Sequence, residues 1–576
     1  MKPVLPLYAL ALGTAVTAPL LAPGYLLVRD AVSTPRSYLT DAALGVGEAA
    51  PRAVPQDFAV AMLSVVVDGG VVVKALLMAG ILLAGWGAGR LAGLVLPEAG
   101  LSGQLLACTL AIWNPYVAER LLQGHWSLLL GYGCLPWVAA LVVRIRTGMQ
   151  AQPAQPAQLA LPAQSALPAW AALAFWIALA GLTPTGLILA TLVAGAALFV
   201  PGAGTARKRC APAIFGISAL AALPWASAAI LGGALNSPQP AAGLSAFASR
   251  AEPGLGVLGT LAGLGGIWNA DAVPWSRTTL FALPATLVLL AVVALGVPAL
   301  IRRPAAVPFL VLAAAGVVLP AALATGPGLG LLGWAVDAVP GLAVLRDGQK
   351  WVAVAMPGYA LAGAGAVVTL RTRLRPPVAA ALLAIALIAV LPDLAWGVGG
   401  KLRPVHYPAG FTAVAAAINA DPRTVAVLPP DIVRRFGWAG PAPVLDPLPR
   451  WVRADVLSTG DLVVAGREVR GEGSRARQVQ RLLLDGADPA ALAGAGVGWV
   501  VLESGGADGQ RLPQLTRLPV VYRDADLTLY RVADPRVRPS PPQRTAVLLA
   551  HLAWAGLLLG GAGAAGVARL RVRRRR

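Results

Sequence analysis

The side chains that could do acid–base chemistry lie beside the apolar stretches of the chain. Asp30 comes directly after the first long apolar stretch, in APGYLLVRD, and Asp41 follows in the same loop. A carboxylate held at a membrane boundary can act as a general base and take a proton from a hydroxyl group. The alternative is a loop carboxylate that is simply exposed or is paired with Arg29, Arg36 or Arg52. Asp30 is therefore the first candidate for a base, and Asp41 is the second.

A second polar group lies in WNPYVAERLLQGHW, between two apolar stretches. We expect Glu119 and Arg120 to lie on a short amphipathic helix near the membrane interface, where an arginine can neutralise a lipid phosphate. The alternative is a helix hairpin in which the two side chains pair with loop partners. His125 follows them, and no second histidine lies near it in the sequence, which argues against a metal role.

Two later loops carry the remaining candidates. In IWNADAVPW, Trp268 and Asn269 combine an aromatic face with an amide, which suits a sugar ring, although a tryptophan there equally suits membrane anchoring. In VLRDGQKW, the cations of Arg346 and Lys350 could bind a lipid phosphate such as a polyprenyl phosphate, with Asp347 orienting one of them. The alternative for both cations is snorkelling to the membrane surface.

The composition places these residues in a membrane protein. Of the 576 residues, 57% are hydrophobic and 12% are charged, and the mean hydropathy is +0.70. Soluble domains carry about 25% charged residues, and disordered chains lack such apolar content, so both classes are excluded. The three cysteines show no paired spacing that would indicate a disulfide framework or a thiolate metal site. Apolar stretches long enough to cross a bilayer as helices number about twelve, near 5–27, 70–89, 101–117, 126–143, 168–184, 186–203, 211–232, 279–301, 305–325, 351–370, 377–396 and 545–567.

The net charge of +20 is explained by where the basic residues lie. With the N-terminus in the cytoplasm, every predicted inner loop is basic, as the positive-inside rule requires. Of the carboxylates outside 397–543, only Glu98 then faces the cytoplasm, which favours polar chemistry on the outer face. The basic surplus serves orientation and contact with the lipid bilayer, not nucleic acid binding. The inner clusters are Arg90, Arg144 and Arg146, Arg207 to Arg209, Arg302 and Arg303, Arg371 to Arg375, and the tail from Arg569 to Arg576.

The predicted fold is an all-α polytopic membrane protein with a small extracytoplasmic α/β domain. Residues 1–396 form the transmembrane domain with about eleven spans, and 544–576 form the last helix and a basic cytoplasmic tail. The segment 397–543 contains β-like runs at 424–428, 497–502, 520–522 and 527–532 and a helix-like stretch at 476–485. Because these runs carry no concentrated acid–base cluster, we expect this segment to bind glycan rather than to perform the chemistry. An Ala/Gln/Pro-rich stretch over 147–168 is interpreted as an inner linker.

These segments together resemble the GT-C superfamily of polyprenyl-phosphate-sugar glycosyltransferases. They are most similar in appearance to actinobacterial arabinofuranosyltransferases and mannosyltransferase-like membrane proteins. Four features carry the resemblance, which covers most of the chain: the acid in PGYLLVRD, the NPYVAERLLQGHW hairpin, the LRDGQKW entry to a later span, and an α/β segment whose GVGWVVLE and DADLTLYRV runs precede the last helix. In the family the catalytic carboxylate lies in the first outer loop, which corresponds to Asp30, with Asp41 in reserve. The family's usual paired-acid motif is not evident here.

The resemblance implies an inverting transfer of a sugar, arabinofuranose or mannose, on the outer face of the cell membrane. The donor would be a polyprenyl-phosphate sugar, and the acceptor a cell-envelope glycan or glycolipid. A divalent cation is optional in the family, and no ligand cluster in this chain demands one. Two other classes stay open: a noncatalytic GT-C-like scaffold in envelope assembly, and a lipid or glycan transporter. A transporter calls for ionisable residues inside the membrane, and the predicted spans contain almost none.

Overall fold

The computed structural model describes residues 3–574 apart from 48–52, 149–166, 233–240, 340, 431, 465–466, 472, 487, 504–514, 516 and 537–538. Nearly all of the expected linker at 147–168, and Arg52, lie outside the described residues. A helix overlaps each of the apolar stretches: α1 Val4–Thr17, α4 Gly69–Val95, α5 Gly100–Ile112, α7 Trp126–Thr147, α8 Leu167–Ala180, α9 Pro184–Ala197, α10 Arg207–Leu231, α13 Ala282–Ile301, α14 Val307–Leu323, α16 Met356–Leu370, α17 Pro376–Ala389 and α23 Arg544–Arg574.

The expected number of about twelve spans is not confirmed. Within the described residues, seven helices are long and apolar enough to cross a membrane, or up to nine spans if each of two bent helix pairs counts as one. The shortfall lies in α5, α8 and α9, which have 13, 14 and 14 residues. At a rise of 1.5 Å per residue, helices of this length reach about 20 Å, against a hydrocarbon core of about 30 Å. The protein is a multi-pass membrane protein with fewer full-length helices than its apolar stretches predict.

The membrane helices pack closely because small residues lie where they cross. At Gly80 in α4, a Cβ atom would lie 2.8 Å from the Cα of Leu130 in α7, so the two backbones touch there. Gly296 in α13 lies equally close to the backbone of Ala362 in α16. Close backbone approach at small residues is typical of helix pairs in membranes, where van der Waals contact replaces the hydrophobic effect as the driving force.

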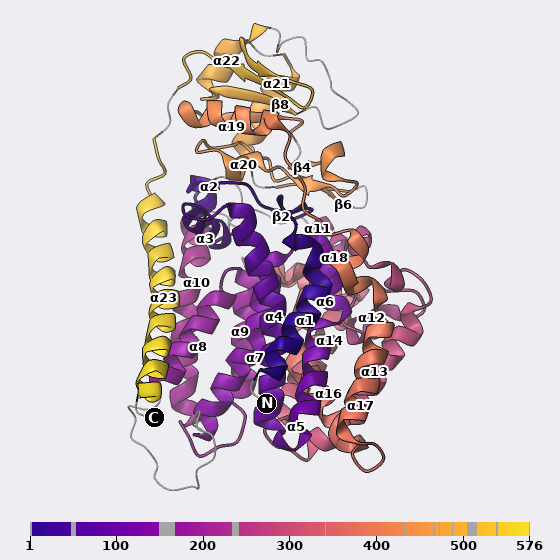
Figure 1. Ribbon diagram of the computed structural model, residues 1–576. Coiled ribbons are helices and arrows are strands. Elements are labelled where there is room, and N and C mark those ends of the chain that lie inside the picture. Colours follow the sequence, from indigo (N-terminus) through magenta and orange to yellow (C-terminus); the bar gives the residue numbers. More distant parts are fainter. Residues whose placement is uncertain are drawn as a thin grey trace.

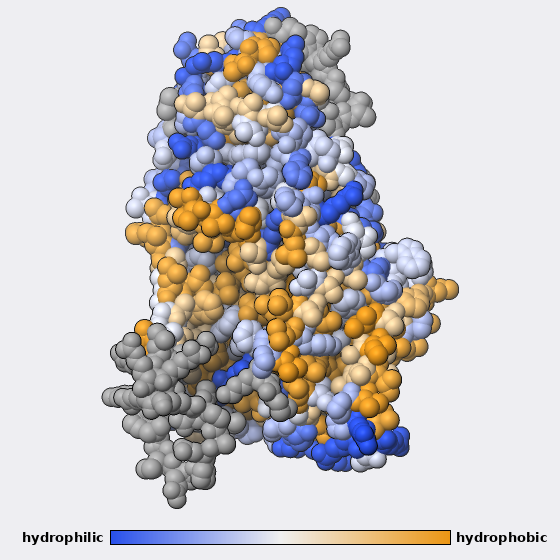
Figure 2. Space-filling model, in the orientation of Figure 1, coloured by the Kyte–Doolittle hydropathy of each residue, from blue (hydrophilic) through white to orange (hydrophobic). Residues whose placement is uncertain are grey.

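The surface of this helical part is apolar. Figure 2 shows hydrophobic residues gathered over the membrane helices, with a hydrophilic rim at the lower end and a largely hydrophilic surface above. Phe199, Phe215 and Ile230 are among the large side chains that are exposed there. Both ends of the chain lie at the lower end, opposite the sheet-bearing part (Figure 1). Arg303 pairs with Glu98 at 2.5 Å, so two of the loops predicted to lie on the inner side do meet.

The sheet domain (residues 401–536) is built on four strands in the order β3-β8-β10-β9. β3 Val425–Leu428 pairs parallel with β8 Trp499–Glu503, and β10 Leu527–Arg531 pairs antiparallel with β8 and with β9 Val520–Arg523. Strands therefore form at all four predicted runs, and α21 Ser474–Leu484 forms at the predicted helix. α19 Ala409–Ala420 contributes to the apolar cluster on one face of the sheet, and α21 to the cluster on the other.

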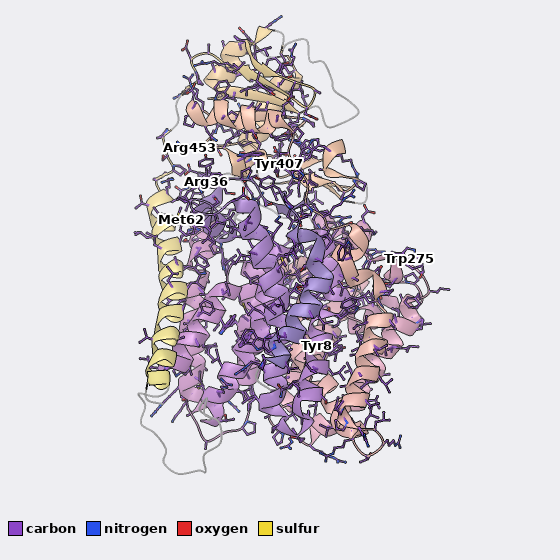
Figure 3. All side chains as sticks on the ribbon, viewed as in Figure 1. Tyr8, Arg36, Met62, Trp275, Tyr407 and Arg453 are labelled. Carbon is purple, nitrogen blue, oxygen red and sulfur yellow. The ribbon has the colours of Figure 1, made fainter. Side chains whose placement is uncertain are left out.

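The first loop, between α1 and α4, lies between the membrane helices and the sheet domain. Its two short strands, β1 Leu27–Val28 and β2 Ala31–Val32, pair antiparallel as a hairpin. Leu27 and Val32 join the same apolar cluster as Phe411 of α19. The Tyr407 hydroxyl donates to the carbonyl of Ser33 at 2.8 Å, and Figure 3 shows Tyr407 in this junction together with Arg36 and Arg453. The hairpin is therefore packed against the sheet domain.

Candidate active site

Asp30 lies in the two-residue turn of the β1–β2 hairpin. Val28 pairs with Ala31, so Arg29 and Asp30 form the turn, and Arg29 has a φ of 46°, in the left-handed region that residues with side chains avoid. The Arg29 guanidinium donates to the carbonyls of Leu122 and Asp271, both at 2.6 Å. The sequence alternatives that paired Asp30 with Arg29 or Arg36 are wrong within the described residues: Arg29 binds backbone carbonyls, and Arg36 binds Ser37, Ala61 and Ser64.

The hairpin rests on the end of α6 Pro115–Gln123. Asparagine 114 caps this helix, because Asn114 accepts from the N–H of Val117 at 3.0 Å and Pro115 occupies the first turn. The helix ends at Gly124, which has a φ of 80°. A Cβ atom on Gly124 would lie 2.4 Å from the amide nitrogen of Ala31 and from the carbonyl oxygen of Val28. Glycine therefore allows both the turn and the close seat of the hairpin, and the N–H of Asp30 donates to the carbonyl of Gln123 at 3.1 Å.

The Asp30 carboxylate is held by two side chains from the α6–α7 junction. His125 Nε2 lies 2.8 Å from Asp30 Oδ2, and Gln123 Nε2 donates to the same oxygen at 3.1 Å. His125 Nδ1 lies 3.0 Å from Nη1 of Arg120. An arginine has only donors, so Nδ1 must accept and Nε2 must carry the proton that is donated to Asp30. The side chain of Asp30 stays 42% exposed, and that of His125 is 16% exposed.

The charges around the pair favour an ionised Asp30 and a neutral His125. Desolvation by the surrounding protein raises the pKa of Asp30, but the hydrogen bonds from His125 and Gln123 and the charge of Lys350 lower it by more, so the net pKa lies below its ordinary value. Burial lowers the pKa of His125 and outweighs the opposite effect of Asp30. The pair therefore has a carboxylate acceptor and an imidazole donor at neutral pH.

Arg120 is buried, and its two terminal nitrogens are engaged, whereas its Nε has no hydrogen-bond partner among the described residues. Its Nη1 and Nη2 donate to the two carboxylate oxygens of Asp347 at 2.9 and 3.0 Å, and Nη2 also binds Gln349. Charge-assisted bidentate pairs of this kind fix geometry strongly. Lys350 Nζ lies 3.7 Å from Asp347 Oδ2, and its side chain is 25% exposed whereas that of Arg120 is 0% exposed. Asp347 therefore orients both cations, and Lys350 is the more accessible of the two.

Glu119 is also fully buried, rather than exposed as it would be on an amphipathic surface helix. Its carboxylate accepts from the N–H groups of Gly266 and Ile267 at 3.2 and 3.0 Å. A second buried carboxylate, Glu252, pairs with Arg277 close to it. An amphipathic surface helix would leave Glu119 and Arg120 exposed, but both are buried and bind loop residues. The alternative, a helix hairpin whose side chains pair with loop partners, therefore fits the structure. Glu119 thus fixes the loop that leads to Trp268.

That loop brings the next predicted residues to the site. Asn269 Nδ2 donates to Gln123 Oε1 at 2.8 Å, so the amide chain Asn269–Gln123–Asp30 is continuous. Trp268 meets Phe247 edge to face at 4.7 Å between ring centroids. Arg346 lies over the same Phe247 ring, 4.2 Å from its centroid. Asn269 is thus connected to Asp30 through Gln123, and Trp268 and Arg346 both contact the Phe247 ring.

Asp41 is placed differently. It begins α2 Asp41–Leu44 and pairs with Arg544 at the start of α23, at 2.7 Å. Among the described residues, it shares no recorded contact with Asp30 or His125.

Sequence reasoning missed Gln123, Gln349, Glu252 and Arg277. Gln123 lies in WNPYVAERLLQGHW and Gln349 in VLRDGQKW, the motifs that also contain Arg120 and Lys350. Their position in these motifs, rather than their residue type, could have indicated a role.

A metal centre at this site would need several ligating side chains close together. Among the described residues, no group of three or more His, Cys, Asp or Glu side chains lies together where it could hold a metal ion. Asp30 and His125 form only a pair, and His125 Nε2 is hydrogen-bonded to Asp30 Oδ2. These two side chains alone do not fit a bound divalent cation.

A search with protein-family models finds no match to this chain, and a search of curated proteins finds none either. Among solved structures, the chain is similar to arabinofuranosyltransferase AftD from mycobacteria, with a TM-score of 0.51 and 16% sequence identity. The similarity covers 92% of this chain and 41% of that one. The predicted resemblance to arabinofuranosyltransferases is thus confirmed at the level of the fold.

Proposed function

We propose that this protein is a membrane glycosyltransferase that moves a sugar, arabinofuranose or mannose, from a polyprenyl-phosphate donor to a cell-envelope glycan or glycolipid. The fold similarity to an arabinofuranosyltransferase supports the class. The observation that carries the proposal is the state of Asp30: it is partly exposed, close to the end of the first membrane helix, and held by His125 and Gln123. A positioned carboxylate at a membrane boundary is what a hydroxyl acceptor and a lipid-linked donor require.

In the proposed reaction, Asp30 takes the proton of an acceptor hydroxyl as its oxygen attacks the anomeric carbon. The glycosidic bond forms while the bond from that carbon to the phosphate oxygen breaks, and polyprenyl phosphate leaves with the electron pair. A single displacement of this kind inverts the anomeric centre. Both hydrogen bonds to the carboxylate end on Oδ2, and no described residue donates a recorded hydrogen bond to Oδ1. Oδ1 is therefore the atom that takes the proton.

The phosphate of the donor would be bound by Lys350 and Arg346. Lys350 is the accessible cation next to Asp347, and Arg346 lies over Phe247 on the same side of the loop. Arg120, whose two terminal nitrogens are engaged by Asp347, Gln349 and His125, acts as a positioning residue: it fixes the His125 tautomer and hence the donor to Asp30. The site and the sheet domain would face the outside of the cell, with both termini in the cytoplasm.

Replacing Asp30 by asparagine tests the proposal directly. Asp30→Asn keeps the volume of the side chain and its contacts with Gln123, but it removes the base, so transfer should fall by about 100- to 10,000-fold. The measurement is radiolabelled sugar transfer by the purified full chain from polyprenyl-phosphate arabinofuranose and from polyprenyl-phosphate mannose. Donor binding, measured separately, should be retained.

Asp41→Asn is the matched control, because it removes a carboxylate of the same loop that pairs with Arg544. It should keep most of the transfer activity. Near wild-type transfer by Asp30→Asn would show that Asp30 is not the general base. A wild-type chain that binds both donors and transfers neither would instead support the noncatalytic scaffold.

A further inference from the structure

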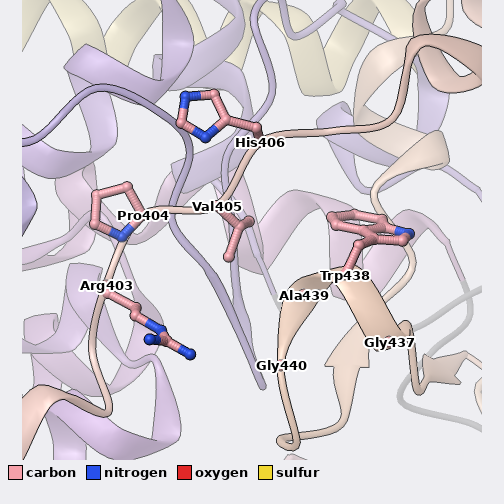
Figure 4. A pocket seen from close by; sticks show the side chains of 8 residues that line it. All are labelled: Arg403, Pro404, Val405, His406, Gly437, Trp438, Ala439 and Gly440. Atoms are coloured by element: carbon pink, nitrogen blue, oxygen red, sulfur yellow. The ribbon is translucent and has the colours of Figure 1, made fainter.

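A pocket of about 450 Å³ opens at the start of the sheet domain. One wall is the segment 403–406, which leads from the membrane helices to α19, and the opposite wall is the turn at 437–440. Figure 4 shows Arg403 and His406 on the first wall and Trp438 on the second. The volume lies within the range of about 300–1,000 Å³ that is typical of small-molecule sites.

Both walls are tied to the hairpin that carries Asp30. Tyr25 and Val405 exchange backbone hydrogen bonds at 2.8 and 2.9 Å, next to the first wall. Beyond the turn that forms the second wall, Pro443 accepts from the N–H of Arg29 at 3.0 Å, and Leu445 donates to the carbonyl of Arg29 at 2.9 Å. Arg29 is the residue before Asp30. The pocket is thus held in a fixed relation to the proposed base, on the side of the hairpin that faces the sheet domain.

The lining of the pocket suits a sugar. The Trp438 ring is held by its other neighbours, stacked on Phe436 at 4.9 Å and tilted against Tyr407 at 5.4 Å between centroids, so its position is preorganised. Arg403 and His406 are exposed, and neither has a recorded hydrogen bond or ion pair with a described residue. A preorganised indole offers apolar surface to the C–H face of a sugar ring, and the guanidinium and imidazole offer polar contacts to its hydroxyls.

We propose that this pocket is a subsite for a neutral oligosaccharide. The oligosaccharide would be the part of the acceptor glycan beyond the sugar unit whose hydroxyl is glycosylated. This inference rests on the proposed transferase function and adds the place where the acceptor is held. The donor would enter from the membrane side, where Lys350 lies, and the acceptor from the side of the sheet domain. The two substrates then meet at Asp30 from opposite sides of one hairpin.

A glycine in the wall gives a clean way to fill the pocket. A Cβ atom on Gly437 would meet nothing within 4 Å, and its φ is not in the left-handed region, so Gly437→Leu should fold and place a side chain in the open space. Gly494 in α22 Pro489–Gly494 has the same two properties and lies outside the pocket, so Gly494→Leu is the matched control. Neither glycine belongs to the catalytic machinery.

The experiment measures binding of short neutral arabino- and manno-oligosaccharides to the detergent-solubilised full chain by calorimetry, without donor. We expect Gly437→Leu to weaken binding by at least about tenfold, or about 1.4 kcal/mol, while Gly494→Leu binds like the wild type. Asp30→Asn should also bind normally. Equal binding by Gly437→Leu and wild type, or no binding by the wild type, would overturn the subsite. Tighter binding of a phosphorylated oligosaccharide that depends on Arg403 would overturn its assignment to a neutral ligand.

Failure of this inference can be told apart from failure of the proposed function. If the wild type transfers sugar and Gly437→Leu transfers with an unchanged KM for the acceptor, the transferase stands and the pocket is not its acceptor subsite. If the oligosaccharide binds and Gly437→Leu prevents binding, but no variant transfers sugar, the pocket stands and the catalytic proposal does not.

Discussion

The hydrogen bond between His125 and Asp30 has one direction, which the neighbouring arginine sets. Because Arg120 donates to Nδ1, the proton of the imidazole lies on Nε2 and points to the carboxylate. The carboxylate is thereby stabilised in its ionised form, and its pKa lies below the ordinary value in spite of desolvation. A histidine that looked isolated in the sequence thus becomes the residue that tunes the proposed base.

This arrangement predicts a shift in the pH profile of the reaction. In the wild type, transfer should be independent of pH well into the acidic range, because Asp30 is protonated only below the ordinary carboxyl pKa of about 4. In His125→Leu the stabilising donor is lost while desolvation remains, so the pKa of Asp30 rises and the acid limb of kcat/KM moves to higher pH. The measurement is kcat/KM for sugar transfer as a function of pH.

His125→Gln serves as the conservative variant, since its amide N–H can still donate to Asp30. It should restore part of the wild-type profile. A uniform loss of rate in His125→Leu, with the acid limb in its original place, would mean that the histidine has only a structural role.

At the scale of elements, the hairpin and the end of α6 work as one unit. Gly124 lets α6 stop and lets the β1–β2 hairpin lie against its last turn. Gly124→Ala should cost about 1–3 kcal/mol from the left-handed backbone alone and should also push the hairpin away. We therefore expect a much larger loss of transfer than of thermal stability.

Gly148→Ala is the control at this scale. Gly148 also ends a helix, α7, with a φ of 71°, but its Cβ atom would have its nearest neighbour at an ordinary 3.5 Å. Its backbone cost should match that of Gly124→Ala, without effect on the hairpin. Comparable losses of transfer in the two variants would argue against a specific role for the close contact between Gly124 and the hairpin. Melting temperature and initial rate, measured on both variants, give the comparison.

The sequence predicted these elements better than it predicted their contacts. The apolar stretches and the four β-like runs each fell on a helix or strand, because length and period are local properties. The expected number of spans is not confirmed, because α5, α8 and α9 are too short to cross a membrane by length alone. The partner of Asp30 could not be predicted, because His125 lies 95 positions away and Arg120 reaches Asp347 across 227 positions. Only the packed helices bring these side chains together.

At the scale of the molecule, the sheet domain lies at the end opposite both ends of the chain (Figure 1). If the positive-inside rule sets the orientation, that domain is outside the cell and the loop before α10 is inside. Lys208→Cys and Arg523→Cys place one thiol at each end, on exposed basic positions. The three native cysteines are buried, so they should give little background.

With intact cells and a membrane-impermeant maleimide, Arg523→Cys should be labelled and Lys208→Cys should be protected until the membrane is opened. Labelling of Lys208→Cys alone would reverse the orientation and move the site to the cytoplasmic face.

The backbone pairing of Arg29 with Pro443 and Leu445 means that the chain does not divide into exchangeable modules. A truncation that ends before the sheet domain would leave the N–H and the carbonyl of Arg29 in the hairpin turn unpaired. The loss of activity would then come from a poorly positioned Asp30 as well as from the missing domain. Grafting the sheet domain of a relative would fail for the same reason unless residues 24–33 travelled with it. These two segments, far apart in the chain, should therefore be inherited and redesigned together.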